Sequence, residues 1–422
     1  MTIVQKVPNN GCGCDSVSGA GLISVDHALA EIARKTRPVA GSDTVPLPEA
    51  VGRVLIDPVR ALGMVPPFAN AAMDGYAINT LDLTGDGPWD LPVTGRVAAG
   101  ETPRSLVVRK SAVQILTGAP VPDGANAVVM LEHVQRTADG IRVTNRVAPR
   151  THIRAAGEDM SAGKIIVPAG RALSPADIAA GAAGGHGHLT VRRALRVALL
   201  VTGDEVCRLG DPRGPAGIWD VNTPMLAAAI ASPAVALCEV HLAADTRPAL
   251  GSQLADLAKS VDLIVTTGGI SVGEEDHVKP ALLDLGASID VSGVALKPGK
   301  PVSFGRFNGT FWLGLPGNPL SAFLTWHLLG KPICRAMIGQ TQVAAPRRPV
   351  TLSRPLRHKP GRCELRLACL SGFDTQGRQI VDFANATHSG RVASLPQMDG
   401  VLVIPAEVET LPQGAQAEFQ LF

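Results

Sequence analysis

The sequence predicts a multidomain α/β protein in which one doubly wound α/β domain accompanies smaller β-rich domains. The length of 422 residues suits about three domains of roughly 150 residues each. Between 195 and 344, near-continuous apolar strand runs alternate with helical runs, which is typical of a parallel sheet covered by helices on both faces. Short β-branched runs broken by Gly and Pro dominate 70–153 and 345–422, which predicts all-β modules.

The predicted domain boundaries follow these changes in pattern. The chain leaves its first block for the all-β module and returns through a strand and a helix, so the linker domain is discontinuous and of mixed α+β type. The expected segments are a flexible tail (1–21), the linker domain (22–69 and 154–194), the small β domain (70–153), the α/β domain (195–344) and a small barrel-like C-terminal β domain (345–422).

Apolar spacing and capping residues predict the helices. The first helix spans Val25–Lys35, whose apolar residues repeat along one helical face. In the α/β domain, Asp245 or Thr246 can cap a helix with Pro248 in its first turn, and Asn222 or Thr223 starts an earlier helix in the same way. The apolar face of the later helix carries Leu250, Leu254, Leu257 and Val261.

Composition argues against several classes of function. The net charge is +2 and no basic run interleaved with aromatic residues occurs, so we expect no nucleic-acid partner. We also expect no signal peptide and no membrane span, because no sufficiently long apolar stretch occurs. The seven cysteines, most of them in apolar context, favour reduced thiols and a cytoplasmic location. Cys12 and Cys14 can hold a soft metal, but a frayed tail without a site is the favoured interpretation.

Polar loops follow the predicted strands of the α/β domain. VALLV leads to Thr202–Glu205, DLIVT leads to Gly268–Asp276, and FWLGL leads to Pro316–Pro319. In an open parallel sheet, ligands bind beyond the carboxyl ends of the strands. A fourth loop brings the ammonium groups of Lys297 and Lys300 within a few residues of each other. We therefore expect one binding site at this edge of the sheet.

The loop TTGGISVGEED joins an anion-binding element to three carboxylates. Gly268, Gly269 and Gly273 let backbone N–H groups point inward, and Ser271 adds a hydroxyl. The acids repel a bare phosphate. When a divalent cation lies between the carboxylates and the phosphate, however, the acids favour binding, because magnesium is coordinated by carboxylates together with phosphates and water. The loop therefore predicts a phosphorylated ligand and a metal, with the two lysines neutralising the remaining charge.

Each of these features has a simpler interpretation when taken alone. The glycine loop can be a tight turn, the acids can lie at a solvated helix N-terminus, and the lysines can form an exposed turn. Their combination at neighbouring strand ends favours a site, although no P-loop or dinucleotide-binding pattern is present. His186 and His188 are interpreted as solvated side chains of a glycine-rich turn, because no acid or Cys lies near them in sequence.

Seven stretches of the chain match the pattern of one known family, in family order, over nearly all of 22–422. They are MDGYA (73–77), LTGAPVPDGANAVV (116–129), RAAGEDM (154–160), VTGDEV (201–206), TTGGISVGEEDHV (266–278), LKPGKPVSFG (296–305) and LPGNPLSA (315–322). Together they resemble the molybdopterin molybdenumtransferases of the MoeA/gephyrin E-domain family. The resemblance implies that the α/β domain is a molybdopterin-binding domain.

The resemblance implies a reaction in molybdenum cofactor biosynthesis. Molybdate is inserted into adenylylated molybdopterin, the phosphoanhydride is hydrolysed with the help of Mg²⁺ or Zn²⁺, and AMP and molybdenum cofactor leave. It also implies a homodimer in which the small β domain of one subunit faces the α/β domain of the other. Contacts with a molybdopterin adenylyltransferase and with apo-molybdoenzymes are implied as well.

The resemblance also implies roles for individual residues. Implied catalytic residues are Asp74, Thr117, Asp159, Glu205, Asp245, Asp276, Lys297 and Lys300. Implied ligand-binding residues are Gly268, Gly269, Ser271, Gly273, Pro316, Gly317, Asn318 and Ser321. Implied metal ligands are Glu205, Glu275 and Asp276. In the dimer, the first two catalytic residues would complete the site of the partner subunit.

The chain departs from the family pattern at several positions. Ala71 stands where relatives often have serine, Gly293 stands where they often have a basic residue, and ADTRP at 244–248 has one acid where they often have two. In the last domain the pattern is only approximate, and Arg362 and Ser389 are candidates there. These departures leave the implied class unchanged.

Two other functions stay open at this point. A cofactor carrier or scaffold would bind the cofactor without turnover, and the retained catalytic positions disfavour it. An adenylyltransferase would consume ATP with molybdopterin in the absence of molybdate. The additional domains disfavour that function, because such enzymes resemble the α/β domain alone.

Overall fold

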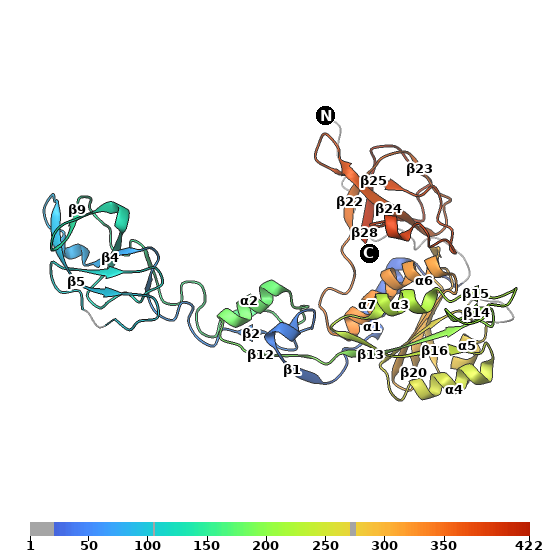
Figure 1. Ribbon diagram of the computed structural model, residues 1–422. Helices are drawn as coiled ribbons and strands as arrows, with labels where there is room; N and C mark the ends of the chain where they lie inside the picture. Colours follow the sequence, from blue (N-terminus) through green and yellow to red (C-terminus); the bar gives the residue numbers. More distant parts are fainter. Residues whose placement is uncertain (1–20, 104–105, 271–275) are drawn as a thin grey trace.

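The computed structural model describes residues 21–103, 106–270 and 276–422 and shows an elongated chain (Figure 1). A small β domain lies at one end, a linker domain lies in the middle, and the α/β domain and the C-terminal β domain lie together at the other end. The predicted multidomain α/β architecture is confirmed. Within the described ranges, no helix is both long and apolar enough to cross a membrane.

Helix α1 (Val25–Lys35) has the predicted bounds but packs on a different domain from the one its position in sequence suggests. Ser24 caps it by accepting a hydrogen bond from His27 N at 3.1 Å. Its apolar face joins the core of the α/β domain beside α7 (Lys331–Met337). The N-terminal helix therefore helps to anchor the linker on the α/β domain.

The linker domain is formed by two segments that are far apart in sequence. Strand β1 (Ser42–Pro46) pairs antiparallel with β12 (His188–Arg192), and β2 (Val59–Arg60) pairs with β11 (Ile165–Val167). Helix α2 (Pro175–Ala183) begins with a capping box and covers a small apolar core. The predicted return of the chain onto its first block is confirmed.

The small β domain is a six-stranded sheet in the order β7-β4-β6-β5-β9-β8. Central β4 pairs antiparallel with both β6 and β7, and a Cβ at its Gly75 would lie 1.9 Å from Val129 O, so only glycine fits there. A short pair, β3 (Asn70–Ala71) with β10 (Ile153–Arg154), leads to the linker domain. The six strands are β4 (Gly75–Ile78), β5 (Trp89–Val97), β6 (Ala112–Ile115), β7 (Ala127–Met130), β8 (Val134–Arg136) and β9 (Gly140–Val143).

The sheet of the α/β domain has the order β16-β13-β17-β21-β20-β18. The first four strands are parallel, as predicted, whereas β20 runs in the opposite direction and pairs antiparallel with both β21 and the edge strand β18. The reversal follows from the two-residue turn at Asn308 and Gly309, whose φ angles are 48° and 82°. The strands are β13 (Leu195–Thr202), β16 (Val235–Ala243), β17 (Leu263–Thr267), β18 (Ser288–Ser292), β20 (Ser303–Phe307) and β21 (Thr310–Leu315).

Helices cover both faces of this sheet, which confirms the doubly wound prediction. Leu199 and Val201 of β13 face the core formed with α1, α3, α6 and α7, whereas Ala198 and Leu200 face the core formed with α4 and α5. The predicted apolar face of α4 is buried. The remaining helices are α3 (Asn222–Ile230), α4 (Arg247–Leu257), α5 (Val278–Asp284) and α6 (Pro319–Thr325).

The C-terminal domain is a closed barrel, as predicted. Its strands follow the order β24-β25-β22-β28-β26, and a further pairing of β24 with β26 closes the ring. Strand β19 (Leu296–Lys297) of the preceding domain adds to β24 at the outside of this barrel. The barrel strands are β22 (Arg348–Leu352), β24 (Cys363–Phe373), β25 (Gln379–Phe383), β26 (Gly400–Ile404) and β28 (Gln416–Leu421), with a short pair β23 (Leu356–Arg357) and β27 (Thr410–Leu411) beside them.

Candidate functional site

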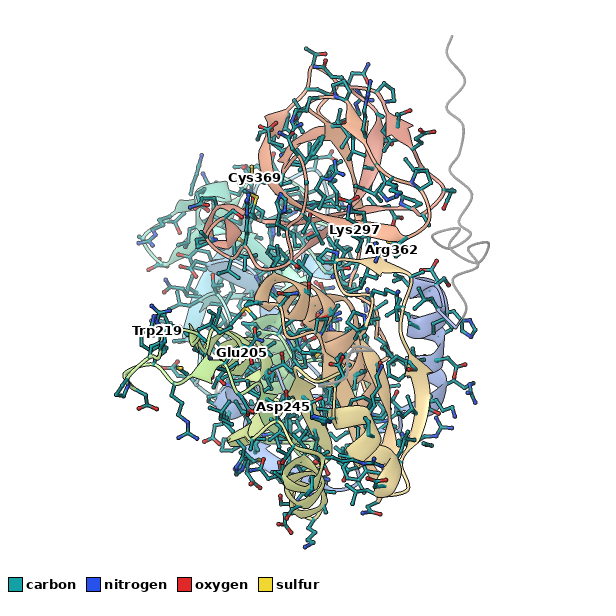
Figure 2. The ribbon with its side chains drawn as sticks, turned by 90° about the vertical axis from the view of Figure 1, so that its right-hand side faces the viewer. Glu205, Trp219, Asp245, Lys297, Arg362 and Cys369 are labelled. Carbon is teal, nitrogen blue, oxygen red and sulfur yellow. The ribbon has the colours of Figure 1, made fainter. Side chains whose placement is uncertain are left out.

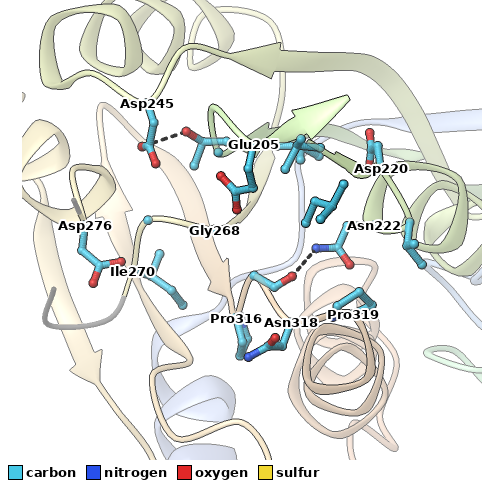
Figure 3. Close-up of a pocket in the computed structure, with 18 of the residues that line it drawn as sticks. Glu205, Asp220, Asn222, Asp245, Gly268, Ile270, Asp276, Pro316, Asn318 and Pro319 are labelled. Atoms are coloured by element: carbon cyan, nitrogen blue, oxygen red, sulfur yellow. Dashed lines mark hydrogen bonds between the residues drawn. The ribbon is translucent and has the colours of Figure 1, made fainter. Parts of the chain in front are cut away.

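A cavity of about 590 Å³ opens at the carboxyl ends of β13, β17 and β21 (Figure 3). All three strand-end loops singled out in the sequence contribute to its lining. They bring together Glu205 from the first loop, Gly268 and Asp276 from the second, and Pro316 and Asn318 from the third. The crevice therefore collects polar groups from chain segments more than 100 residues apart in sequence.

Glycine shapes the loop after β17. Gly268 and Gly269 have φ angles of 95° and 58°, which disfavour any side chain. A Cβ at Gly268 would lie 2.4 Å from Thr202 O, so the loop reaches the end of β13 only as glycine. Gly268 N donates to Leu315 O at 3.3 Å. This N–H is therefore used within the fold, and Gly268 contributes shape rather than an anion-binding donor.

Asp245 connects two of the loops. Its Oδ1 accepts a hydrogen bond from the Thr202 hydroxyl at 2.9 Å, and its N–H donates to Asp204 Oδ1 at 3.1 Å. Of the two predicted cap residues of α4, Thr246 occupies the cap position, although its side chain makes no cap bond. The carboxyl group of Asp245 lines the cavity instead.

Negative charge is crowded at this end of the cavity. The pKa of Asp245 is raised, mainly by burial and further by the negative charges of Asp204 and Glu205. The hydrogen bond from Thr202 and the nearby His277 lower this pKa, but by less. Figure 3 shows Glu205 pointing into the same cavity. Carboxylates that repel one another in this way suit a hard divalent cation, which relieves the repulsion.

The structure shows only part of the predicted metal-ligand set. Asp276 lines the cavity, but Glu275, Ser271 and Gly273 lie outside the described residues, as do Cys12 and Cys14. Among the described residues, no group of three or more His, Cys, Asp or Glu side chains is placed to hold a metal alone. A magnesium ion here would therefore depend on oxygens of the ligand and on water, as it usually does.

We expect Asp245→Asn to raise the free energy of unfolding at pH 7 by roughly 0.5–1 kcal/mol, after allowing for solvent screening. A carboxyl with a raised pKa stabilises the fold when protonated, and this contribution is lost as the pH rises through the folded-state pKa. Asparagine removes the charge and can still accept the Thr202 bond. Urea unfolding should show a smaller gain at pH 4 than at pH 7, and a destabilised variant at pH 7 would contradict this explanation.

The floor of the cavity contains a residue that sequence analysis treated only as a helix start. Asn222 is 8% exposed, and its Nδ2 donates to Thr267 Oγ1 at 2.9 Å and to Gly317 O at 2.7 Å. Thr223 N in the first turn of α3 donates instead to Asp220 Oδ1 at 2.9 Å. Asn222 thus joins the start of α3 to two strand-end segments, a role hidden by separations of 45 and 95 residues.

The mouth of the cavity carries an aromatic side chain that sequence analysis also missed. Trp219 lies in β15 (Ile218–Trp219), which pairs with β14 (Val206–Cys207), and it is 44% exposed. The guanidinium carbon of Arg213 lies 5.6 Å from the centre of the indole ring. An exposed tryptophan at the entrance of a crevice offers a flat surface to a heteroaromatic ligand.

The loop before α6 borders the cavity, but not every predicted residue of this segment reaches it. Pro316, Gly317 and Asn318 line the cavity, and Thr267 Oγ1 donates to Pro316 O at 3.0 Å. Ser321 is 3% exposed within α6 and is not among the lining residues. The candidate Ser389 lies close by in space, since its carbonyl accepts from Leu320 N at 2.9 Å.

The two predicted lysines lie beside the cavity rather than in its lining. Lys300 is exposed, whereas Lys297 is half-buried and its Nζ lies 3.5 Å from Glu364 Oε2. In Figure 2, Lys297 and Arg362 lie toward the C-terminal domain, and Glu205 and Asp245 lie farther down in the view. The positive and negative groups of the predicted site therefore occupy different parts of the crevice region.

Asp74 and Thr117 are brought together at the far end of the chain. Gly75 pairs with Ile115 across β4 and β6, so the residues flanking this pair become neighbours. Asp74 Oδ1 accepts bonds from Thr117 N and Thr117 Oγ1, both at 2.7 Å. Both bonds lower the pKa of Asp74 and keep it ionised, and the bond from Thr117 N has the larger effect. Both residues lie in the small β domain, remote from the cavity of the same chain.

The remaining candidates lie in turns or in tightly packed positions. Asp159 is exposed and its N–H donates to Val65 O at 3.0 Å, near the junction of linker and small β domain. His186 is half-buried with its Nε2 2.7 Å from Arg60 O, and His188 begins β12, so the prediction of two solvated turn histidines is only partly correct. Gly293 has a φ of 125°, and a Cβ there would lie 2.7 Å from Leu22 Cδ2. The basic residue that relatives often carry at this position therefore does not fit here without rearrangement.

Comparisons with known proteins agree with this organisation. The model of the MoeA N-terminal region (domain I and II) matches 23–185, the model of a probable molybdopterin binding domain matches 198–336, and the model of the MoeA C-terminal region (domain IV) matches 349–422. The chain is 34% identical over 404 residues to molybdopterin molybdenumtransferase 2 of Mycobacterium tuberculosis (strain CDC 1551 / Oshkosh), which covers 93% of this chain and 97% of the relative. It is 32% identical over 326 residues to the molybdopterin molybdenumtransferase of Haemophilus influenzae, with coverage of 77% and 80%.

A solved structure agrees with the fold of the whole chain. The crystal structure of the molybdopterin biosynthesis moeA protein from Pyrococcus horikoshii OT3 superimposes with a TM-score of 0.82 at 27% identity. The match covers 95% of this chain and 100% of the other. The similarity therefore extends to the order and arrangement of all the domains.

Proposed function

Because the chain belongs to the MoeA family of molybdopterin molybdenumtransferases, we propose that it inserts molybdate into adenylylated molybdopterin and releases AMP and molybdenum cofactor. The observation that carries this proposal is the cavity at the strand ends, which combines the glycine loop with Glu205, Asp245 and Asp276. Such a crevice suits a ligand that carries phosphates and a planar ring system.

The chain's own groups would divide the work between the two ends of the ligand. Gly268 and Gly269 leave space for the close approach of a phosphate, and Trp219 at the mouth offers a stacking surface for a ring. Glu205 and Asp276 would hold a divalent cation, which supplies charge neutralisation at the phosphoanhydride. Lys297 would bind the incoming oxyanion from the side of the C-terminal domain.

We extend the proposal to a homodimer that shares its sites between subunits. The ionised Asp74 and its partner Thr117 are exposed and remote from the cavity of their own chain, so they can act only in another copy. Exposed apolar side chains flank this pair and the junction with the linker domain, which suits contact with a second subunit. They are Leu62, Met64, Phe68 and Met73.

A cytoplasmic location and contacts with a molybdopterin adenylyltransferase and apo-molybdoenzymes complete the proposal. Five cysteines in the described ranges are free, as expected for a reducing compartment. The chemistry requires a supplier of the adenylylated substrate and an acceptor for the finished cofactor.

Release of AMP tests the proposed function. The purified chain is incubated with adenylylated molybdopterin, Mg²⁺ and molybdate, and AMP is quantified over time. We expect AMP release that requires both molybdate and the divalent cation and that stops when the cation is chelated. Tight cofactor binding without AMP release would indicate a carrier, and ATP consumption with molybdopterin alone would indicate an adenylyltransferase.

A further inference from the structure

We propose that Glu364, a buried carboxylate of the C-terminal barrel, is a positioning residue that holds the Lys297 ammonium group in place for the oxyanion. The inference deepens the proposed function and rests on it, because it concerns the lysine assigned there to the oxyanion. Glu364 belongs to β24 and was not among the residues singled out in the sequence. Its side chain is 1% exposed, whereas that of Lys297 is 40% exposed.

The backbone brings the two residues together. Strand β19 pairs parallel with β24, and Lys297 is the direct partner of Glu364 in this register. Cys363 N donates to Ala295 O at 2.9 Å, which extends the ladder by one bond. On the other side of the lysine, Gly299 packs so closely on α6 that a Cβ would lie 2.4 Å from Thr325 Cγ2. The backbone of the Lys297 loop is therefore held between the barrel and α6.

The other partners of Glu364 leave one of its oxygens to the lysine. Arg366 Nη2 donates to Glu364 Oε1 at 3.0 Å. His358 Nε2 lies 3.6 Å from Oε2, but His358 Nδ1 lies 2.6 Å from Val408 O, and a carbonyl can only accept. Lys297 Nζ lies 3.5 Å from the same oxygen, within ion-pair distance.

This arrangement prepares Lys297 for an anion before the anion arrives. Among the described residues, Glu364 is the one carboxylate within 4 Å of Lys297 Nζ. A free lysine side chain samples many rotamers, and this conformational entropy is lost when the side chain is fixed. Because Glu364 already restricts the Lys297 side chain in the folded protein, the entropic cost of substrate binding is smaller. The C-terminal barrel would thereby contribute to the site of its own chain without touching the substrate.

Glu364→Gln tests the inference, with Asp262→Asn as the matched control. Asp262 is also a poorly exposed carboxylate paired with two cations, Arg193 and Arg196, but it precedes β17 at the opposite end of the sheet from the cavity. We expect Glu364→Gln to raise the KM for molybdate by about tenfold or more, with a smaller effect on kcat, a change of the size seen when the hydrogen-bond partners of metal-ligating side chains are removed. Asp262→Asn should leave this KM unchanged.

Two further measurements keep the inference separate from the proposed function. Combined with Lys297→Gln, Glu364→Gln should raise the KM no further, because it acts through that lysine. Independently of activity, the rate at which an acylating reagent modifies Lys297, followed by mass spectrometry, should rise several-fold in Glu364→Gln and remain unchanged in Asp262→Asn. If Glu364→Gln fails to fold, Glu364→Asp, which retains the charge with a shorter reach, should give intermediate shifts.

Several outcomes would overturn the positioning role. The first is a molybdate KM that stays unchanged in folded Glu364→Gln or Glu364→Asp, and the second is a KM shift in Asp262→Asn as large as that in Glu364→Gln. The third is a double variant, Lys297→Gln with Glu364→Gln, whose KM exceeds that of Lys297→Gln alone. The fourth is an acylation rate of Lys297 that Glu364→Gln leaves unchanged. A wild-type chain that releases no AMP would instead count against the proposed function. The acylation rates would still decide whether Glu364 holds the lysine.

Discussion

Asp276→Asn is expected to lower kcat for AMP release by about a hundredfold or more, because it removes a charge from the part of the cavity assigned to the cation and the phosphoanhydride. Asp276 lines the cavity together with Asp245 and Glu205. Asparagine keeps the size of the side chain, so the loss should reflect charge rather than packing. The measurement is kcat at saturating adenylylated molybdopterin and molybdate.

A surface acid on the next helix provides the control. Asp284 in α5 pairs with Arg247 of α4 on the exposed surface, away from the cavity lining. Asp284→Asn should keep kcat within about twofold of wild type, since surface ion pairs contribute little. If Asp276→Asn retained wild-type kcat, the assignment of the acids to the reaction would have to be abandoned.

Mixing two inactive variants should restore activity if the sites are shared between subunits. Asp74→Ala damages the small β domain, and Asp276→Asn damages the α/β domain, so each homodimer alone should be nearly inactive. A heterodimer carries both lesions in one site and none in the other. After subunit exchange, random assortment of the two chains should return about a quarter of wild-type activity.

The physical reason lies in the distance between the two damaged regions. The Asp74–Thr117 pair is at the opposite end of the elongated chain from the cavity, so the two meet only between subunits. As the control, each variant alone is taken through the same subunit-exchange procedure. Mixed samples that stay as inactive as the separate variants, while mass measurement shows heterodimers, would rule out the shared site.

The sheet and the strand-end loops were predictable from the sequence because they depend on local patterns. Continuous apolar runs identified β13, β17 and β21, and the polar residues after each strand fell at one edge of the sheet. The apolar face of α4 was likewise readable from its spacing. Periodicity and turn chemistry act over a few residues, and these features need nothing more.

Contacts that join distant segments were not predictable. Nothing near Asn222 in sequence indicates that it bonds to Thr267 and Gly317, and nothing near Lys297 points to Glu364, 67 positions later. The sequence likewise left open whether Asp245 or Thr246 caps α4, because the hydrogen bond that Asp245 accepts comes from Thr202 at the end of β13. These side chains take their roles from strand register and loop packing, which a single sequence does not display.

A divalent cation should allow the acids and a phosphate to share one cavity, and AMP binding followed by Trp219 emission tests this arrangement most directly. Trp219 is exposed at the mouth, whereas Trp312 and Trp326 are each 1% exposed. At constant ionic strength, Mg²⁺ should lower the AMP concentration for half-saturation by about tenfold or more. The signal should vanish in Trp219→Phe, and the Mg²⁺ effect should vanish in Asp276→Asn. Half-saturation at the same AMP concentration with and without Mg²⁺ would contradict the account.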